Sequence, residues 1–128
     1  MSHKSKGTAG ERELVKRFWD NGWAAIRSPG SGSSRLPSPD IIAGTRTRKI
    51  VIEAKMTKDD RKYFEDEEIA QIRKFGEVFG AEPWVAVKFK GEDWLFLTLE
   101  DLAKTEKGSA ITKDIAKIKG LLLEEVIK

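Results

Sequence analysis

The sequence lacks cysteine altogether and contains a single histidine, His3, in a polar opening segment. The first absence excludes a disulfide framework, a cysteine-ligated zinc or iron–sulfur centre, and thiol catalysis. The second excludes catalytic triads that depend on histidine and zinc sites built from several histidines. Chemistry on this chain must therefore come from carboxylates, lysine, arginine or serine.

Long apolar runs are also missing. No stretch approaches the roughly 20 apolar residues that a membrane-spanning helix needs, and the first residues carry no hydrophobic signal core. These absences predict a soluble, cytoplasmic protein with no membrane partner. An apolar fraction of 39%, with 11 aromatic residues, suffices for one hydrophobic core, so residues 1–128 are expected to form a single domain.

Charge is distributed unevenly along the chain. In total, 24 Lys and Arg residues exceed 21 Asp and Glu residues by three, but residues 27–62 alone carry nine basic and four acidic side chains. A basic stretch of this kind is the usual electrostatic signature of a polyanionic partner, above all a phosphate backbone. A solvated basic surface without a partner is the alternative, and charge alone leaves both open.

Periodicity and capping signals predict three helices. Thr8 and Glu11 match a capping box, which predicts a helix with Thr8 as its N-cap that ends at Asn21-Gly22. A second helix is expected over about 66–79 and a third over about 112–127.

Five strands are predicted, at residues 23–26, 40–43, 50–56, 84–87 and 94–97. The Ser/Gly/Pro-rich segment 28–38 is expected to be a mobile loop. The order of elements predicts an α/β domain with a central mixed five-stranded sheet flanked by helices. In the strand IVIEAKM, Glu53 and Lys55 project from the same face, because side chains alternate along a strand.

Three acidic residues lie where surface acids are not expected. Glu11 falls on the apolar face of the first helix, Asp40 opens an apolar strand after Pro39, and Glu53 interrupts another. Burying a charge costs several kcal/mol unless it is paired or binds a metal. Carboxylates on adjacent strands and a nearby helix suit Mg²⁺, and Lys55 beside them can orient a water. Together with the basic surface, this set predicts phosphodiester hydrolysis.

Each acid also has a separate explanation. Glu11 can be the capping-box partner of Thr8, and Asp40 can cap a turn after Pro39. Glu53 and Lys55 can form an ion pair on a solvated sheet face. One shared site accounts for all three acids at once, and for this reason we prefer it.

Pro39-Asp40 followed by Glu53-Ala54-Lys55 resembles the PD-(D/E)xK nuclease signature. Together with further matching segments, the chain from about residue 6 to 100 resembles the archaeal-type Holliday junction resolvases (Hjc/Hje); these segments are KGTAGERELV at 6–15, RSPGSG at 27–32, PDIIAG at 39–44 and IEAKM at 52–56. The resemblance implies a restriction-endonuclease-like fold. It also implies a structure-specific DNA endonuclease that resolves four-way junctions by paired symmetric nicks.

The same resemblance assigns roles to residues. It implies that Glu11, Asp40 and Glu53 hold Mg²⁺, for which Mn²⁺ can substitute, and that Lys55 serves the attacking water. It implies further roles near the chemistry for Arg12, Arg27 and Ser31, with no small-molecule cofactor. Lys6, Arg12, Arg27, Arg35 and Lys58 are the candidate DNA contacts, and the Gly/Ser-rich loop that carries Arg35 can reorganise around a DNA strand. Arg12 can instead pair with Glu53 or Asp40.

Two symmetric cuts in a four-way junction require two active sites, which a two-fold homodimer supplies. The resemblance places Phe75 and Phe79 at or near the dimer contact, although an aromatic pair four residues apart on a helix is also common in a core. Two other functions remain open from the sequence. One is a restriction-like or repair nuclease that cuts linear or flapped DNA, and the other is a non-catalytic DNA-binding protein.

Overall fold

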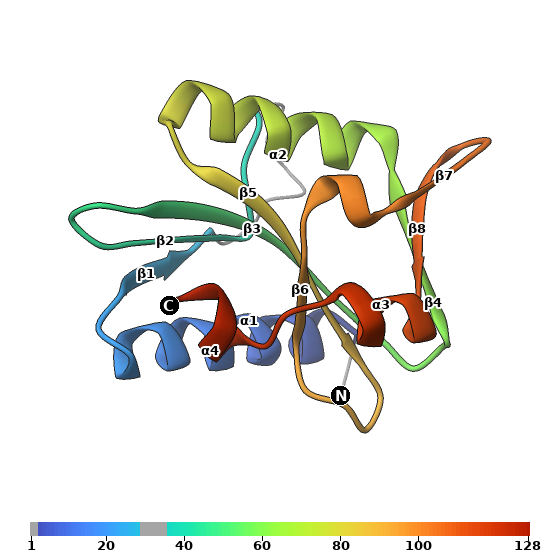
Figure 1. The fold of residues 1–128 in the computed structure, drawn as a ribbon, viewed down its shortest axis with the longest axis horizontal. Helices are drawn as coiled ribbons and strands as arrows, with labels where there is room; N and C mark the ends of the chain where they lie inside the picture. Colours follow the sequence, from blue (N-terminus) through green and yellow to red (C-terminus); the bar gives the residue numbers. More distant parts are fainter. Residues whose placement is uncertain (1–2, 29–35) are drawn as a thin grey trace.

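The computed structural model of the protein describes residues 3–28 and 36–128, and within residues 3–6 it describes only the backbone. Figure 1 shows the elements in chain order: α1 (His3–Asp20), β1 (Ala24–Arg27), β2 (Ile41–Gly44), β3 (Lys49–Thr57), β4 (Arg61–Glu65), α2 (Asp66–Phe79), β5 (Glu82–Phe89), β6 (Leu95–Leu97), the 3₁₀ turn η2 (Leu99–Asp101), β7 (Ala103–Thr105), β8 (Gly108–Thr112), α3 (Lys113–Lys119) and α4 (Leu123–Val126).

The main sheet has the strand order β1-β2-β3-β5-β6. β1, β2 and β3 are antiparallel neighbours, β3 and β5 run parallel, and β6 returns antiparallel to β5. The parallel step requires a crossover, which β4 and α2 provide. These are the five strands that the sequence predicted, and the mixed five-stranded sheet is confirmed.

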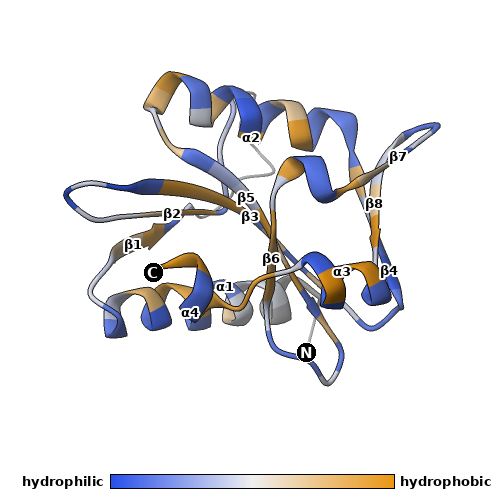
Figure 2. Ribbon diagram, viewed as in Figure 1, coloured by the Kyte–Doolittle hydropathy of each residue, from blue (hydrophilic) through white to orange (hydrophobic). Residues whose placement is uncertain are grey.

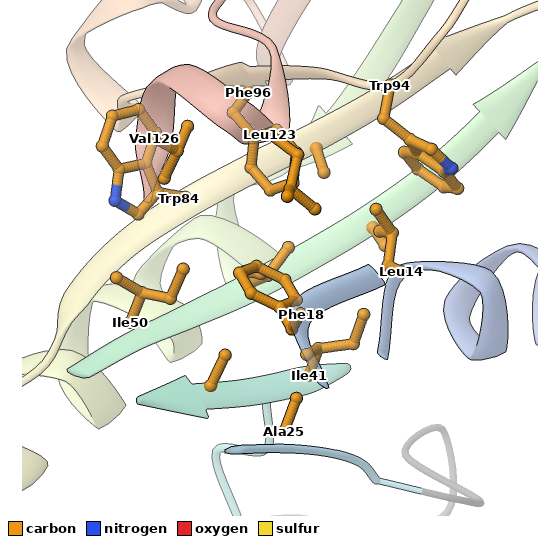
Figure 3. Packing of buried hydrophobic residues seen from close by; sticks show 14 of the residues in the cluster. Leu14, Phe18, Ala25, Ile41, Ile50, Trp84, Trp94, Phe96, Leu123 and Val126 are labelled. Atoms are coloured by element: carbon orange, nitrogen blue, oxygen red, sulfur yellow. The ribbon is translucent and has the colours of Figure 1, made fainter. Parts of the chain in front are cut away.

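Both faces of this sheet are covered. On one face, α1 and α4 pack Phe18, Leu123 and neighbouring side chains against Trp84 and Phe96 (Figure 3). On the other face lie α2, the second sheet and α3, with Ile72 and Phe64 among the side chains that contact the sheet. The middle of β3 and of β5 is buried on both faces, and the residues there are apolar; Figure 2 shows this hydrophobic stretch along β3.

A second sheet, of strand order β4-β8-β7, was not predicted from the sequence. Its strands are short and mostly polar or small, with the sequences RKYFE, GSAIT and AKT. Phe64 is the only buried residue of β4, and it pairs with Ser109 of β8, forty-five positions away. Strand formation here depends on pairing and packing between segments that are distant in the chain, and the local periodicity of the sequence does not reveal such strands.

Two helix predictions were wrong in their limits. α1 begins at His3, so Thr8 lies inside it and is not its N-cap. The predicted capping box is therefore absent, and the Glu11 carboxylate lies 3.4 Å from Arg27 of β1. The loop predicted at 28–38 falls mainly on residues 29–35, which lie outside the described part of the chain.

The single helix expected over 112–127 is two helices. Thr112 caps α3 as predicted, with its hydroxyl accepting the backbone N–H of Ile115. At Gly120 the backbone becomes extended, and Leu121 then exchanges two backbone hydrogen bonds of 2.8 Å with Phe96 of β6. Pairing with the sheet therefore interrupts the helix. Among the described helices, none has the length and apolar character to cross a bilayer.

Candidate active site

The site is built where β2 begins and β3 passes beside it. Asp40 stands immediately before β2, and its carboxylate oxygen Oδ2 accepts the backbone N–H of Ala54 at 2.9 Å. The backbone N–H of Asp40 donates to the carbonyl of Ile52 at 3.0 Å. Two hydrogen bonds thus fix the first acid against the segment of β3 that carries Glu53 and Lys55.

Asp40 and Glu53 form a closely spaced pair of carboxyl groups with little access to water. Asp40 is 8% exposed and the Glu53 side chain 13% exposed, and each carboxyl group acts on the pKa of the other. Burial, followed by the charge of Asp40, raises the pKa of Glu53 to about 8. Burial also raises the pKa of Asp40. Ionising both carboxyl groups is therefore unfavourable in the metal-free protein, and a bound cation would relieve this cost, which is the electrostatic condition for binding one.

Lys55 is the cation that partly offsets these charges. Its Nζ lies 3.5 Å from Glu53 Oε2 and 2.6 Å from Glu68 Oε2. Burial by itself would lower the pKa of Lys55, but the hydrogen bond to Glu68 and the neighbouring carboxylates raise it above the ordinary value. The amine is therefore protonated at neutral pH.

Glu68 is a site residue that the sequence interpretation missed. Burial would raise its pKa, but the hydrogen bond from Lys55 and the N–H of Glu65 lower it, so this carboxylate stays ionised. A usable signal was present: Glu68 lies four and seven residues before Ile72 and Phe75, on the apolar stripe of α2. The criterion that singled out Glu11, an acid on an apolar helix face, selects Glu68 as well.

Glu11 approaches the same region from α1. Its Oε1 lies 3.4 Å from Nε of Arg27, and both side chains are largely shielded from water. Burial, and then the charge of Asp40, raises the pKa of Glu11. Arg27 is the last residue of β1 and pairs with Ile41, the residue that follows Asp40. This register brings Arg27 close to Asp40, and Glu11 of α1 comes with it through their ion pair.

The three predicted metal-binding acids are not a ready-made ligand set. Within the described residues, no group of three or more histidine, aspartate or glutamate side chains is arranged to hold a metal ion. Asp40 and Glu53 are paired with each other, whereas Glu11 is paired with Arg27. A role for Glu11 as a third ligand stays a prediction.

The remaining predicted residues are placed as follows. Arg12 is exposed on α1 and, in the described part of the chain, forms no ion pair with Asp40 or Glu53. Lys58 is exposed just after β3. Ser31, Arg35 and the side chain of Lys6 lie outside the described residues.

Phe75 and Phe79 occupy the second half of α2, with ring centroids 5.6 Å apart. Phe75 packs against the core, but Phe79 is 42% exposed and carries the Lys49 ammonium 4.6 Å above its ring. Phe79 also lines a shallow apolar hollow of about 270 Å³ with Ile26, which is 65% exposed at the sheet edge. Phe75 thus belongs to the core, and Phe79 belongs to the surface.

The family model described as archaeal Holliday junction resolvase (Hjc) matches residues 2–128, almost the whole chain. This chain belongs to that family. Membership confirms the family predicted from the PD and EAK segments, and with it the class of crossover junction endonuclease. The roles of individual residues are not decided by it.

Relatives from this family match this chain over 90% or more of their own length. The chain is 42% identical over 123 residues to the crossover junction endodeoxyribonuclease Hjc of Archaeoglobus fulgidus, covering 96% of this chain and 90% of that protein. It is 32% identical to the Hje enzyme of Saccharolobus solfataricus, covering 94% of each. The solved structure of A. fulgidus Hjc, described as a Holliday junction resolvase from an archaeal hyperthermophile, superimposes with a TM-score of 0.88 at 38% identity, covering 95% of this chain and all of that one.

Proposed function

We propose that this protein resolves four-way DNA junctions by metal-dependent hydrolysis, with Asp40 and Glu53 as the carboxylates that hold the metal. The observation that carries the proposal is the buried Asp40–Glu53 pair with Lys55 beside it, in a chain of the resolvase family. Two carboxylates fit Mg²⁺ well, because this ion retains several waters and completes its shell with substrate phosphates. Mn²⁺ accepts the same oxygen ligands and is expected to substitute.

A divalent ion at this pair would lower the pKa of a bound water and offset charge on the phosphoryl group. The side chains of the protein position the reacting water. The Lys55 ammonium donates a hydrogen bond to the attacking water and so fixes its direction. The water oxygen forms a bond to phosphorus and releases a proton to the surrounding water, while the bond to O3′ breaks and O3′ takes up a proton from the surrounding water, which leaves a 5′-phosphate and a 3′-hydroxyl end.

Glu11 and Arg27 change partners when the DNA binds. Their 3.4 Å contact is longer than a good charge-assisted hydrogen bond and lies beside Asp40. A DNA phosphate is a stronger partner for the planar guanidinium, so Arg27 exchanges Glu11 for the phosphate next to the cut. Glu11, once released, faces the metal position as the predicted third carboxylate.

Further basic residues position the junction without reading its sequence. Arg12 and Lys58 are exposed, one directly after Glu11 in the chain and the other three residues after Lys55, and we assign Lys6, Ser31 and Arg35 to the same DNA-facing surface. Contacts to phosphates fix orientation and carry no base information, so recognition depends on branched shape.

Two symmetric cuts require a homodimer with two such sites. The half-exposed Phe79 and the exposed Ile26 beside it supply an apolar surface of the kind that dimer contacts use. β1 is an edge strand of the main sheet at the same place. We therefore assign the contact to the hollow between α2 and β1.

The test uses a labelled four-way junction and a linear duplex with the same arm sequences, each incubated with Mg²⁺, with Mn²⁺ and with EDTA. Paired nicks on the junction alone, in either metal and not in EDTA, are expected. Comparable cutting of the linear duplex would instead identify a restriction-like or repair nuclease. Junction binding without cleavage in either metal would identify a DNA-binding protein.

A further inference from the structure

The carboxylate of Glu68 connects the start of α2 to the active site. One of its oxygens, Oε1, accepts the backbone N–H of Glu65 at 3.1 Å, and the other, Oε2, lies 2.6 Å from the Lys55 ammonium. The first contact is the reciprocal half of a capping box, which fixes the direction of the side chain at the helix start. Glu68 therefore presents a carboxylate to Lys55 from a fixed position.

Lys55 needs such an anchor. A lysine side chain is a compact charge on a flexible four-carbon stem, so its ammonium lies wherever the nearest acceptors hold it. Of the two acids in contact, Glu68 is the nearer, at 2.6 Å compared with 3.5 Å for Glu53. The shorter contact draws the amine towards α2 and away from the Asp40–Glu53 pair.

We propose that Glu68 is a positioning residue that holds the Lys55 ammonium on the α2 side of Glu53, which leaves the Asp40–Glu53 pair for the divalent cation. This inference rests on the proposed metal-dependent cleavage. Without Glu68, the ammonium moves onto other acids of the described chain whose charge already acts on it, Glu53 and Asp40. There it competes with the cation for the same oxygens, and it no longer points at the attacking water.

The chain offers a variant that separates this role from helix capping. In Glu68→Gln, the amide oxygen can still accept the N–H of Glu65, because glutamine also closes a capping box. The amide N–H₂ then faces the ammonium of Lys55, donor against donor, so that contact is lost. Glu67→Gln is the matched control, because it changes the net charge of the protein by the same amount. Glu67 is exposed on the same helical turn, and its Oε1 accepts a hydrogen bond from Nε2 of Gln71 at 3.2 Å.

The first measurement uses metal-free protein and needs no cleavage. Heteronuclear NMR of lysine side-chain ammonium groups detects those that are held in hydrogen bonds. Glu68→Gln is expected to shift or broaden the Lys55 signal beyond detection, while Glu67→Gln leaves it in place. An unchanged Lys55 signal in Glu68→Gln would overturn the positioning role.

The second measurement is a double-mutant cycle on single-turnover junction cleavage. Glu68→Gln is expected to lower the rate about 10- to 100-fold and to raise the Mg²⁺ concentration for half-maximal rate, with the junction Kd in EDTA within about twofold of wild type. In a Lys55→Met background, Glu68→Gln should change the rate by less than about threefold, because the residue acts through the amine. A full further loss in that background would overturn the inference.

These two measurements separate this inference from the proposed function. A wild-type protein that fails to cut the junction contradicts the proposed cleavage, while the NMR signal of the metal-free protein still decides where Glu68 holds the amine. Junction cleavage at the wild-type rate by the Glu68→Gln variant would contradict the inference and leave the proposed cleavage intact.

Discussion

The carboxylate of Asp40 accepts the backbone N–H of Ala54, the residue that separates Glu53 from Lys55 in β3. This single bond joins the PD segment to the EAK segment through the main chain. Because the partner is a backbone group, the Asp40 carboxylate is held against β3 whichever rotamers Glu53 and Lys55 adopt. The first prediction follows from it.

Asp40→Asn is expected to fold, because the asparagine carbonyl oxygen can still accept the N–H of Ala54. Junction cleavage should fall on the order of 10³-fold, since the charge that holds the metal is lost. Junction binding in EDTA should be unchanged or tighter, because one negative charge facing the phosphates is removed. Gel-based cleavage and fluorescence anisotropy measure the two effects.

Asp20→Asn, at the exposed far end of α1, is the control for Asp40→Asn and should cut at the wild-type rate. Normal cleavage by Asp40→Asn would show that the metal is held elsewhere.

The raised pKa of Glu53, about 8, makes the stability of the metal-free protein depend on pH. In the unfolded chain this carboxyl titrates near 4.5, so between about pH 4.5 and 8 the folded state holds a proton that the unfolded state has released. The free energy of unfolding should therefore fall as pH rises through this window, by on the order of a few kcal/mol, and level off above it. Asp40 and Glu11, whose pKa values are also raised, contribute with the same sign.

Urea unfolding in EDTA between pH 5 and 8.5 measures this decline. Glu53→Gln should reduce it, while Glu67→Gln should retain it. A saturating divalent cation should restore stability at high pH, because it binds the ionised carboxylates of the folded state. A wild-type protein whose stability rises across the window would contradict the assignment of a protonated Glu53.

Phe79→Asp is expected to convert a dimer into a monomer of 14.4 kDa, because a charge at the apolar hollow cannot be desolvated against a partner. The fold should survive, since Phe79 is already 42% exposed. Light scattering after size-exclusion chromatography measures the mass, and circular dichroism checks the fold. Paired cutting of a junction should become single, uncoordinated nicking.

The control for the dimer variant is Ile118→Asp on α3, where the side chain is 78% exposed and does not line the hollow. It should remain a dimer. If Phe79→Asp also remained one, the contact would lie on another face.

Gly108→Ala tests the second sheet. A Cβ at this position would lie 2.2 Å from the carbonyl oxygen of Phe64, so β4 and β8 would have to separate. The free energy of unfolding should fall by about 1–3 kcal/mol, as for other overpacked sites. Gly7→Ala in α1, where a Cβ meets nothing within 4 Å, should instead be neutral or stabilising by up to about 1 kcal/mol. Chemical denaturation of the two variants measures both effects.

The sequence by itself determined the main sheet and singled out most of the charged side chains that the structure gathers around Asp40. Strand 50–56 alternates regularly enough to place Glu53 and Lys55 on one face, and acids in apolar surroundings identified Asp40 and Glu11, because a buried charge violates a pattern that is visible locally. Residues whose partners are distant in the chain were not accessible in this way. β4 and β8 form only because they pair with each other across more than forty residues.

Only the tertiary structure decided how the acids are distributed around the amine. Three acidic residues open α2, and their order in the chain does not say which of them faces β3. Packing of the helix on the sheet turns Glu68 to Lys55 and leaves Glu67 in solvent. It also separated Glu11, held by Arg27, from the Asp40–Glu53 pair. Sequence patterns report which face of an element is buried, whereas electrostatic partners depend on distances between elements, and those distances are set by packing.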